Sequence, residues 1–107
     1  MEIEIPFNTW SKKKLKTGKC ATSRNTKYGS SGDTFTVDGV EYELTNVRRL
    51  ELEMVANRFY IEEGMTSPDE FKKVWQGIYP LSGWTPKKMV WIHFFRKKFT
   101  NIIAKNQ

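Results

Sequence analysis

Residues 17–24, TGKCATSR, bring an amine, a hydroxyl and a guanidinium within six positions of one another, at Lys19, Thr22 and Arg24. A threonine oxygen attacks a carbonyl carbon only after a neighbouring base takes its proton. A lysine amine can act as that base when desolvation or nearby cations lower its pKa from about 10.4. The lysines of residues 12–16 and Arg24 could supply such cations, but taken alone these residue types beside a strand are most often ordinary surface residues.

The alternation of a β-strand constrains how these side chains can meet. If residues 20–24 are extended, one face carries Cys20, Thr22 and Arg24, and the other carries Ala21 and Ser23. Lys19 then faces away from Thr22. It reaches the Thr22 hydroxyl only from a turn before the strand, where Gly18 allows unusual backbone angles.

Composition predicts a single folded domain over residues 1–107. Hydrophobic residues make up 38% of the 107 residues and aromatic residues 14%, which favours a packed core over disorder. The net charge of +6 favours polyanionic partners such as RNA, although the same excess also keeps a protein soluble. No repeat or low-complexity tract divides the chain.

The cellular setting is expected to be the cytoplasm. Cys20 is the sole cysteine and cannot form an internal disulfide, and no apolar stretch approaches the roughly 20 residues of a membrane helix. The opening residues, MEIEIPFNTW, lack the basic and then apolar pattern of a secretory signal. We expect no membrane association, and we favour a monomer.

The first half of the chain predicts a short helix and several strands. Residues 1–5 alternate and meet Pro6, which predicts a short strand, and Asn8 or Thr9 could cap a helix that Gly18 closes. A brief strand and a loop follow. In TFTVDGVEYEL, residues 34–44, the Asp38-Gly39 pair predicts a two-residue hairpin turn. The apolar phase shifts after Asn46, which predicts a bulge in one long strand of a curling sheet.

The second half predicts two helices and a last strand. Ser67, Pro68 and Glu70 form a capping box, and the helix that follows carries an apolar stripe of Phe71, Val74, Trp75 and Ile78. Residues 53–64 predict another helix closed by Gly64, and residues 89–95 are apolar at both parities, as in a central strand covered on both faces. The expected fold is α+β, a curled and mostly antiparallel sheet with helices at its ends.

Several spaced elements together resemble the ASCH domain family. They are GKCATSR, the Gly32-Asp33 pair before an apolar strand, IEEGM followed by SPDEFKKVWQGIYP, and the final VWIHFF strand, covering about residues 5–99. The resemblance implies a PUA-like curled β-barrel with flanking helices and a cleft that binds RNA. Some small bacterial members look like amidohydrolases that remove the acetyl group from 4-acetylcytidine.

In that subgroup the resemblance implies a catalytic set of Lys19, Thr22 and Glu63, with Arg24 closing the K-x-x-T-x-R pattern. The sequence departs from the subgroup at Cys20, at Ser23, where an apolar residue is usual, and in the added LSGWTPKK of residues 81–88. Glu63 would orient the lysine or carry a proton to the leaving amine, and Arg24 would stabilise the oxyanion. Against this, a carboxylate beside a lysine favours the charged amine, so a structural ion pair that closes a loop is the alternative.

The basic residues are candidates for binding phosphates. Two groups could flank one groove, namely Lys12, Lys13, Lys14, Lys16 and Lys19 before the cleft, and Arg96, Lys97 and Lys98 after the last strand. Tyr28, Trp10 or Trp84 could stack on unpaired bases. The alternatives are solvated lysines and tryptophans in the core.

The sequence thus predicts an ASCH-type domain that binds RNA or a modified nucleoside in a basic cleft. The alternatives are an amidohydrolase acting on 4-acetylcytidine through Lys19, Thr22 and Glu63, and a partner-binding domain with an inactive cleft. His93 is expected to be structural and Cys20 a packed thiol, since one histidine and one cysteine make no metal set. We expect no metal and, in the absence of a glycine-rich phosphate loop, no cofactor.

Overall fold

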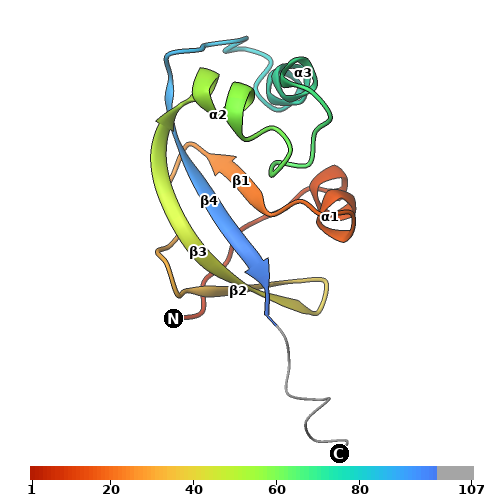
Figure 1. Ribbon diagram of the computed structural model, residues 1–107, viewed down its shortest axis with the longest axis vertical. Helices are drawn as coiled ribbons and strands as arrows, with labels where there is room; N and C mark the ends of the chain where they lie inside the picture. Colours follow the sequence, from red (N-terminus) through yellow and green to blue (C-terminus); the bar gives the residue numbers. More distant parts are fainter. Residues whose placement is uncertain (99–107) are drawn as a thin grey trace, which may run out of the picture.

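The computed structural model describes residues 1–98, and within them a four-stranded antiparallel sheet is combined with three helices (Figure 1). The elements are α1 (Thr9–Lys16), β1 (Ala21–Arg24), β2 (Thr34–Val37), β3 (Val40–Glu51), α2 (Leu52–Arg58), α3 (Pro68–Ile78) and β4 (Met89–Lys97). The strand order is β1-β4-β3-β2, so β1 and β2 are the two edges. Figure 1 shows α2 and α3 together at one end of the curled sheet and α1 beside β1. The predicted α+β class and curled antiparallel sheet are confirmed.

The β2–β3 hairpin is built as its turn residues predict. Asp38 and Gly39 both have positive φ, +49° and +80°, which is the geometry of a tight two-residue turn. Further along β3, the register with β4 shifts between Leu44 and Asn46. This is the predicted bulge, and it lies in the long strand that curves across the sheet (Figure 1).

The central position of β4 is also confirmed. It pairs with β1 on one side and β3 on the other, and the neighbouring residues Ile92 and His93 are both fully buried. Adjacent strand residues point to opposite faces, so both faces of β4 are covered. One apolar cluster, which includes Ile92, packs beneath α2 and α3, and a second, which includes Phe95 and Phe35, fills the hairpin end.

Helix α3 begins where its capping residues predict. The Ser67 hydroxyl accepts from the Glu70 N–H at 3.1 Å, and Pro68 occupies the first turn. The Glu70 carboxylate accepts from the Thr66 N–H at 2.8 Å, one residue earlier than in a standard capping box. Phe71 and Trp75 of the predicted stripe are buried, whereas Val74 is half-buried and Ile78 exposed.

Two predicted elements were wrong in extent. Residues 1–5 form only an isolated parallel bridge, Glu2 with Thr34, because β2 is short and Pro6 lacks an N–H to continue a ladder. The helix predicted over residues 53–64 ends at Arg58. The Glu62 carbonyl accepts instead from the N–H groups of Cys20 and Ala21, at 2.8 and 2.9 Å, so residues 59–64 form turns against the start of β1.

Residues 81–88 contact the start of α2. The carbonyls of Lys88 and Pro86 accept from the N–H groups of Leu52 and Glu53, and Trp84 packs edge-on against Phe71. Among the helices of residues 1–98, none has the length and apolar character needed to cross a bilayer.

Candidate functional site

A cavity of about 400 Å³ lies beside the edge strand β1. Lys19, Thr22, Ser23 and Arg24 on its wall come from β1 and the turn before it, and Glu63 comes from the loop after α2. Asn8 and Ser11, at the start of α1, also line it. Its apolar lining includes Phe7, Trp10, Met65, Phe71, Trp75 and Tyr79. Ile78 and Val74 also line it, which explains why half of the apolar stripe of α3 stays accessible.

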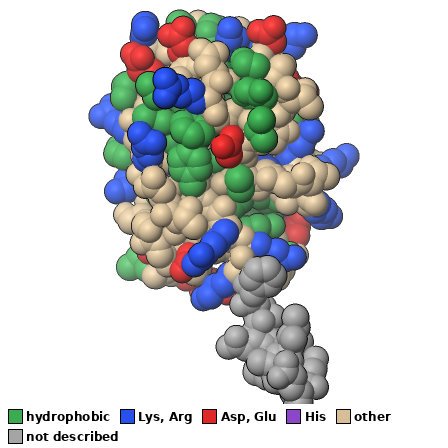
Figure 2. Space-filling view, in the orientation of Figure 1, with side chains coloured by type: hydrophobic (Ala, Val, Ile, Leu, Met, Phe, Trp, Pro, Cys, Tyr) green, Lys and Arg blue, Asp and Glu red, His purple; other side chains and the backbone are tan. Residues whose placement is uncertain are grey.

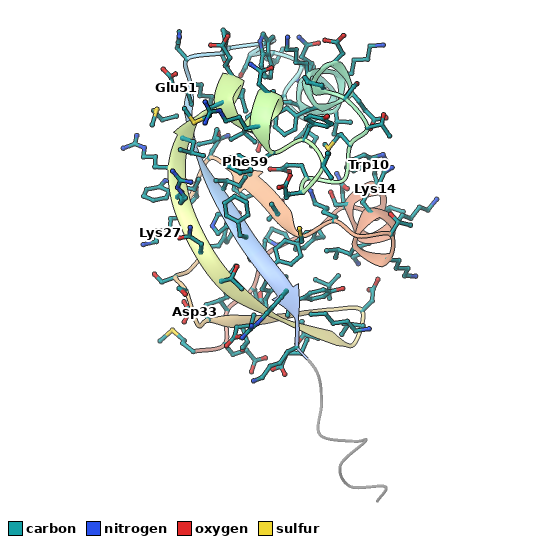
Figure 3. All side chains as sticks on the ribbon, viewed as in Figure 1. Trp10, Lys14, Lys27, Asp33, Glu51 and Phe59 are labelled. Carbon is teal, nitrogen blue, oxygen red and sulfur yellow. The ribbon has the colours of Figure 1, made fainter. Side chains whose placement is uncertain are left out.

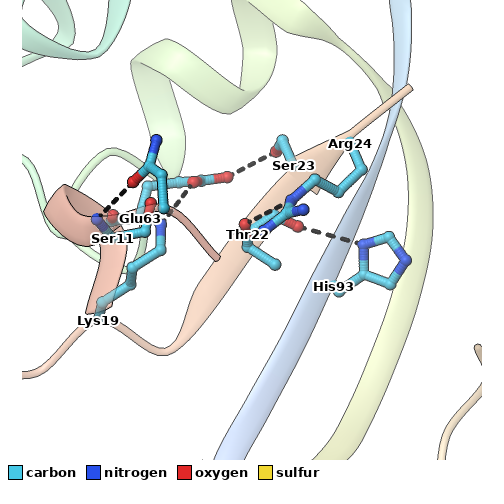
Figure 4. A network of polar contacts seen from close by, with 8 residues as sticks. Ser11, Lys19, Thr22, Ser23, Arg24, Glu63 and His93 are labelled. Atoms are coloured by element: carbon cyan, nitrogen blue, oxygen red, sulfur yellow. Dashed lines mark hydrogen bonds and ion pairs between the residues drawn. The ribbon is translucent and has the colours of Figure 1, made fainter. Parts of the chain in front are cut away.

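Lys19 and Glu63 form a buried ion pair in this cavity (Figure 4). The Lys19 Nζ lies 3.1 Å from Glu63 Oε1 and 2.7 Å from the backbone carbonyl oxygen of the same residue. Both residues are nearly inaccessible, with 5% and 3% of their surface exposed. A buried charge needs such pairing, because transfer of an isolated ion out of water costs several kcal/mol or more.

Two glycines in left-handed conformations place this pair. Gly18, with φ of +115°, ends α1, and the Lys19 N–H then donates to the Lys14 carbonyl at 2.9 Å. Gly64, with φ of +96°, follows Glu63 and lets the loop turn against β1. A Cβ at position 64 would lie 3.2 Å from the Cβ of Lys14 and 3.3 Å from that of Lys19, so the loop and α1 are in close contact.

Ser23 joins the ion pair. Its hydroxyl donates to Glu63 Oε2 at 2.5 Å, so the two carboxylate oxygens are held by Lys19 and Ser23. Sequence reasoning assigned Ser23 no role. The signal that could have found it is the strand alternation, which places Lys19 and Ser23 at the same parity and Thr22 at the other.

The Thr22 hydroxyl forms its hydrogen bond with Arg24 and not with Lys19. The Arg24 Nε donates to Thr22 Oγ1 at 3.1 Å, and the guanidinium lies 5.0 Å from the ring centre of Phe7 and 5.7 Å from that of Tyr28. Burial lowers the pKa of Arg24, an effect that Tyr28 and Glu63 partly offset, but an arginine remains charged at neutral pH. Lys19, Thr22 and Glu63 therefore line one cavity, whereas the hydrogen bonds of Lys19 Nζ in residues 1–98 go to Glu63.

The Tyr28 ring contacts the Arg24 guanidinium, and the His93 ring contacts the backbone of Thr22. His93 Nε2 accepts from the Tyr28 N–H at 3.0 Å, and His93 Nδ1 lies 3.2 Å from the Thr22 carbonyl oxygen. This pairing assigns a neutral ring with its proton on Nδ1. Burial lowers the pKa of His93, in keeping with the structural role predicted for it. The Tyr28 ring lies outside the cavity lining, against Arg24 and His93.

The lysines of α1 are distributed around the helix and do not line this cavity. Lys12 lies 3.4 Å from the Asp38 carboxylate, Lys14 lies over the Trp10 ring, and Lys13 is exposed. Lys16 lines a second groove of about 510 Å³, together with Lys19, Arg96 and Lys97. Lys16 and Lys19 of the first predicted cationic group therefore line the same groove as Arg96 and Lys97 of the second. Arg96 also forms an ion pair with Glu43 at 2.8 Å. Figure 2 shows basic side chains spread around the visible face, including its right-hand edge and its lower part, and Figure 3 shows Lys14 next to Trp10 on α1.

Cys20 also lines the second groove. It is half-buried, and burial, together with the charge of Glu62, raises the pKa of its thiol. A raised pKa keeps the protonated form at neutral pH, as a packed thiol requires.

Comparison with known proteins identifies the fold. No family model matches the sequence, and neither does any curated protein. The structure is similar to the crystal structure of an ASCH domain from Lactobacillus crispatus JV V101, with a TM-score of 0.66 and 13% sequence identity over 90% of this chain and 77% of that chain. The chain therefore has the fold of an ASCH domain, a PUA-like curled antiparallel half-barrel with three helices in its described residues.

Proposed function

We propose that this chain is an ASCH-type domain that binds a planar, nucleoside-sized ligand, either a modified nucleoside or such a nucleoside within RNA. The observation that carries the proposal is the cavity of about 400 Å³ with aromatic side chains on one part of its wall and Lys19, Thr22, Ser23, Arg24 and Glu63 gathered on another. Ligand pockets of this size are mostly apolar with a few convergent polar groups. Protein sites for unpaired bases combine ring stacking with hydrogen bonds to the base edge.

The polar groups of the cavity suit the edge of a base. Arg24 has one N–H committed to Thr22, and its remaining guanidinium donors can bind a carbonyl oxygen. Glu63 can accept from an exocyclic amino group, and Lys19 adds a second cationic donor. Cytosine and its derivatives present both a carbonyl and an exocyclic nitrogen.

The second groove provides a place for phosphates. Lys16, Arg96 and Lys97 line it, and Lys19 lines both this groove and the cavity. A strand whose base enters the cavity could therefore contact cationic side chains through its backbone. Such contacts release counterions, so they predict an affinity that falls as salt rises.

Calorimetric titration with 4-acetylcytidine, cytidine and a short single-stranded RNA tests this proposal. We expect saturable binding of the modified nucleoside with little salt dependence, and binding of RNA that weakens with salt. Ile78→Trp, which fills space at the cavity, should weaken nucleoside binding, whereas Ile61→Trp, at another exposed isoleucine, should not. Failure of all three ligands to bind the folded protein would contradict the proposal.

A second candidate function is hydrolysis of the acetyl amide of 4-acetylcytidine. The observation that favours it is the buried Lys19–Glu63 pair at 3.1 Å, with the hydroxyl groups of Thr22 and Ser23 on the wall of the same cavity. In such a reaction Glu63 accepts the proton of the attacking hydroxyl, Lys19 donates one to the leaving amine, and Arg24 stabilises the oxyanion.

Chromatographic detection of cytidine after incubation with 4-acetylcytidine tests this activity. Glu63→Gln should lower kcat by at least about 100-fold, because it removes the proton acceptor. Glu62→Gln is the matched control, since the fold uses the backbone carbonyl of that residue in binding β1. Absence of cytidine with folded protein would remove hydrolysis and leave the binding proposal to its own test.

A further inference from the structure

We propose that the attacking hydroxyl in this cavity belongs to Ser23 and not to Thr22. The inference rests on the proposed amidohydrolase function, and it changes the residue that the family resemblance implies. It concerns Ser23, a position at which the family resemblance implies an apolar residue.

Ser23 has the contact that a nucleophile requires. Its Oγ donates to Glu63 Oε2 at 2.5 Å, within the range of charge-assisted O–H···O⁻ hydrogen bonds. The carboxylate is in turn held through its other oxygen by Lys19, at 3.1 Å. A hydroxyl, a base in hydrogen-bond reach and a third group that orients the base is the recurring arrangement of activated nucleophiles.

Thr22 has the opposite kind of contact. Its Oγ1 accepts a hydrogen bond from the Arg24 Nε, so a cationic donor engages one of the two lone pairs and lowers the nucleophilicity of the oxygen. Within residues 1–98 the carboxylate contacts of the cavity hydroxyls come from Ser23. Thr22 is therefore placed to orient Arg24, whose free N–H groups can bind the oxyanion (Figure 4).

The strand geometry explains this division. The Ala21 N–H donates to the Glu62 carbonyl, so the loop that carries Glu63 runs along the start of β1. Ser23 lies two residues further, at the same parity as Ala21 and Lys19, and it therefore meets the Glu63 carboxylate. Figure 4 shows the Glu63 side chain between Lys19 and Ser23, with Arg24 folded back onto Thr22.

The reaction needs only the side chains of this cavity and one water molecule. Glu63 Oε2 takes the Ser23 proton as Oγ bonds to the acetyl carbon, and the carbonyl electrons move to an oxyanion beside Arg24. The C–N bond then breaks as Lys19 Nζ gives a proton to the amine, and Lys19 regains one from the protonated Glu63. Water, deprotonated by Glu63, attacks the Ser23 ester, and the proton on Glu63 passes to Oγ as the ester C–O bond breaks. Acetic acid leaves and gives its own proton to solvent.

Covalent labelling with phenylmethanesulfonyl fluoride tests the assignment independently of the natural substrate. The reagent forms an O–S bond with an activated hydroxyl and releases fluoride, and peptide mass spectrometry locates the adduct. We expect the adduct on Ser23 and a labelling rate at least about 100-fold lower in Ser23→Ala, because the nucleophile is absent. The variant Thr22→Val, similar in shape, should still be labelled on Ser23. Circular dichroism checks that each variant is folded.

The outcomes separate this inference from the proposed function. An adduct on Thr22, or none on the folded protein, would overturn the assignment of Ser23. Wild-type turnover of 4-acetylcytidine by Ser23→Ala would also overturn it while leaving the amidohydrolase proposal in place. Labelling of Ser23 without any turnover of 4-acetylcytidine would support the nucleophile and remove the proposed substrate.

Discussion

The buried ring of His93 lies with Nδ1 3.2 Å from the carbonyl oxygen of Thr22, which is its register partner across the β4–β1 pair. The ring therefore connects the central strand of the sheet to the edge strand that carries the candidate site. Its second nitrogen accepts from the Tyr28 N–H, so the neutral form satisfies both partners. A proton added to Nε2 would point at the Tyr28 N–H, which is itself a donor, so the protonated ring would lose this hydrogen bond.

His93 predicts a loss of stability in mild acid. Burial lowers its pKa in the folded chain, so between about pH 6.5 and the lower folded value the unfolded chain binds more protons. Stability should fall as pH drops below about 6.5, by at most about 1.4 kcal/mol per pH unit from this group. Urea unfolding between pH 7.5 and 5 measures how the free energy of unfolding changes with pH. His93→Gln should be less stable at pH 7.5 but have a flatter profile, and an unchanged slope would contradict the assignment.

The Lys19–Glu63 pair predicts strong coupling in a double-mutant cycle. Glu63→Gln leaves a buried ammonium without its counter-ion and should cost about 3–5 kcal/mol in the free energy of unfolding. Lys19→Met should cost a similar amount, and the double variant should cost clearly less than the sum. Lys12→Met, which removes the exposed pair with Asp38, is the control and should change stability by no more than about 1 kcal/mol. Additive effects at Lys19 and Glu63 would contradict a coupled buried pair.

The positive φ of Gly64 and its close neighbours predict that this position, next to the site, requires a glycine. Gly64→Ala places a Cβ at positive φ and about 3.2 Å from Lys14 Cβ, so it should destabilise the fold by about 1–3 kcal/mol and displace Glu63. Gly77→Ala is the matched change, because its Cβ meets nothing within 4 Å and it lies in α3. That variant should be about 0.5–1 kcal/mol more stable. Thermal unfolding measures both, and equal effects would argue against strain at Gly64.

Arg24 predicts a requirement for a planar guanidinium. Arg24→Lys keeps the charge but loses the stacking on Phe7 and the geometry of the hydrogen bond from Nε to Thr22. We expect nucleoside binding to weaken by about tenfold or more, from the loss of one charge-assisted hydrogen bond. Calorimetry measures the affinity. The control is Arg58→Lys, at an exposed position at the end of α2, and retention of wild-type affinity by Arg24→Lys would argue against this role.

The second groove predicts a change in salt dependence. Lys16→Gln and Lys97→Gln should each weaken RNA binding and reduce the slope of log affinity against log salt by about 0.7. The exposed Lys73 of α3 supplies the control, since Lys73→Gln lies outside both grooves. Fluorescence anisotropy at several salt concentrations measures the slopes. If all three variants kept the wild-type slope, the second groove would not be the site that holds the RNA backbone.

Local patterns were sufficient for most of the elements. The Asp38-Gly39 turn, the bulge after Leu44 and the capping of α3 by Ser67 are confirmed because each depends on residues close in sequence. The helix expected up to Gly64 was wrong because the Glu62 carbonyl binds β1, a contact between residues about 40 positions apart. Local propensity contains no information about such a partner.

Patterns in the sequence alone were enough to predict a curled α+β fold, a turn that could place Lys19 before β1, and a brief strand that carries hydroxyl groups. They also determined that Lys19 and Ser23 share one parity and Thr22 the other. Which hydroxyl meets the Glu63 carboxylate could be learned only from the folded chain, because it depends on how the loop of residues 59–64 packs on β1. Strand alternation sets the side to which each side chain points, whereas the partner on that side comes from a distant part of the chain.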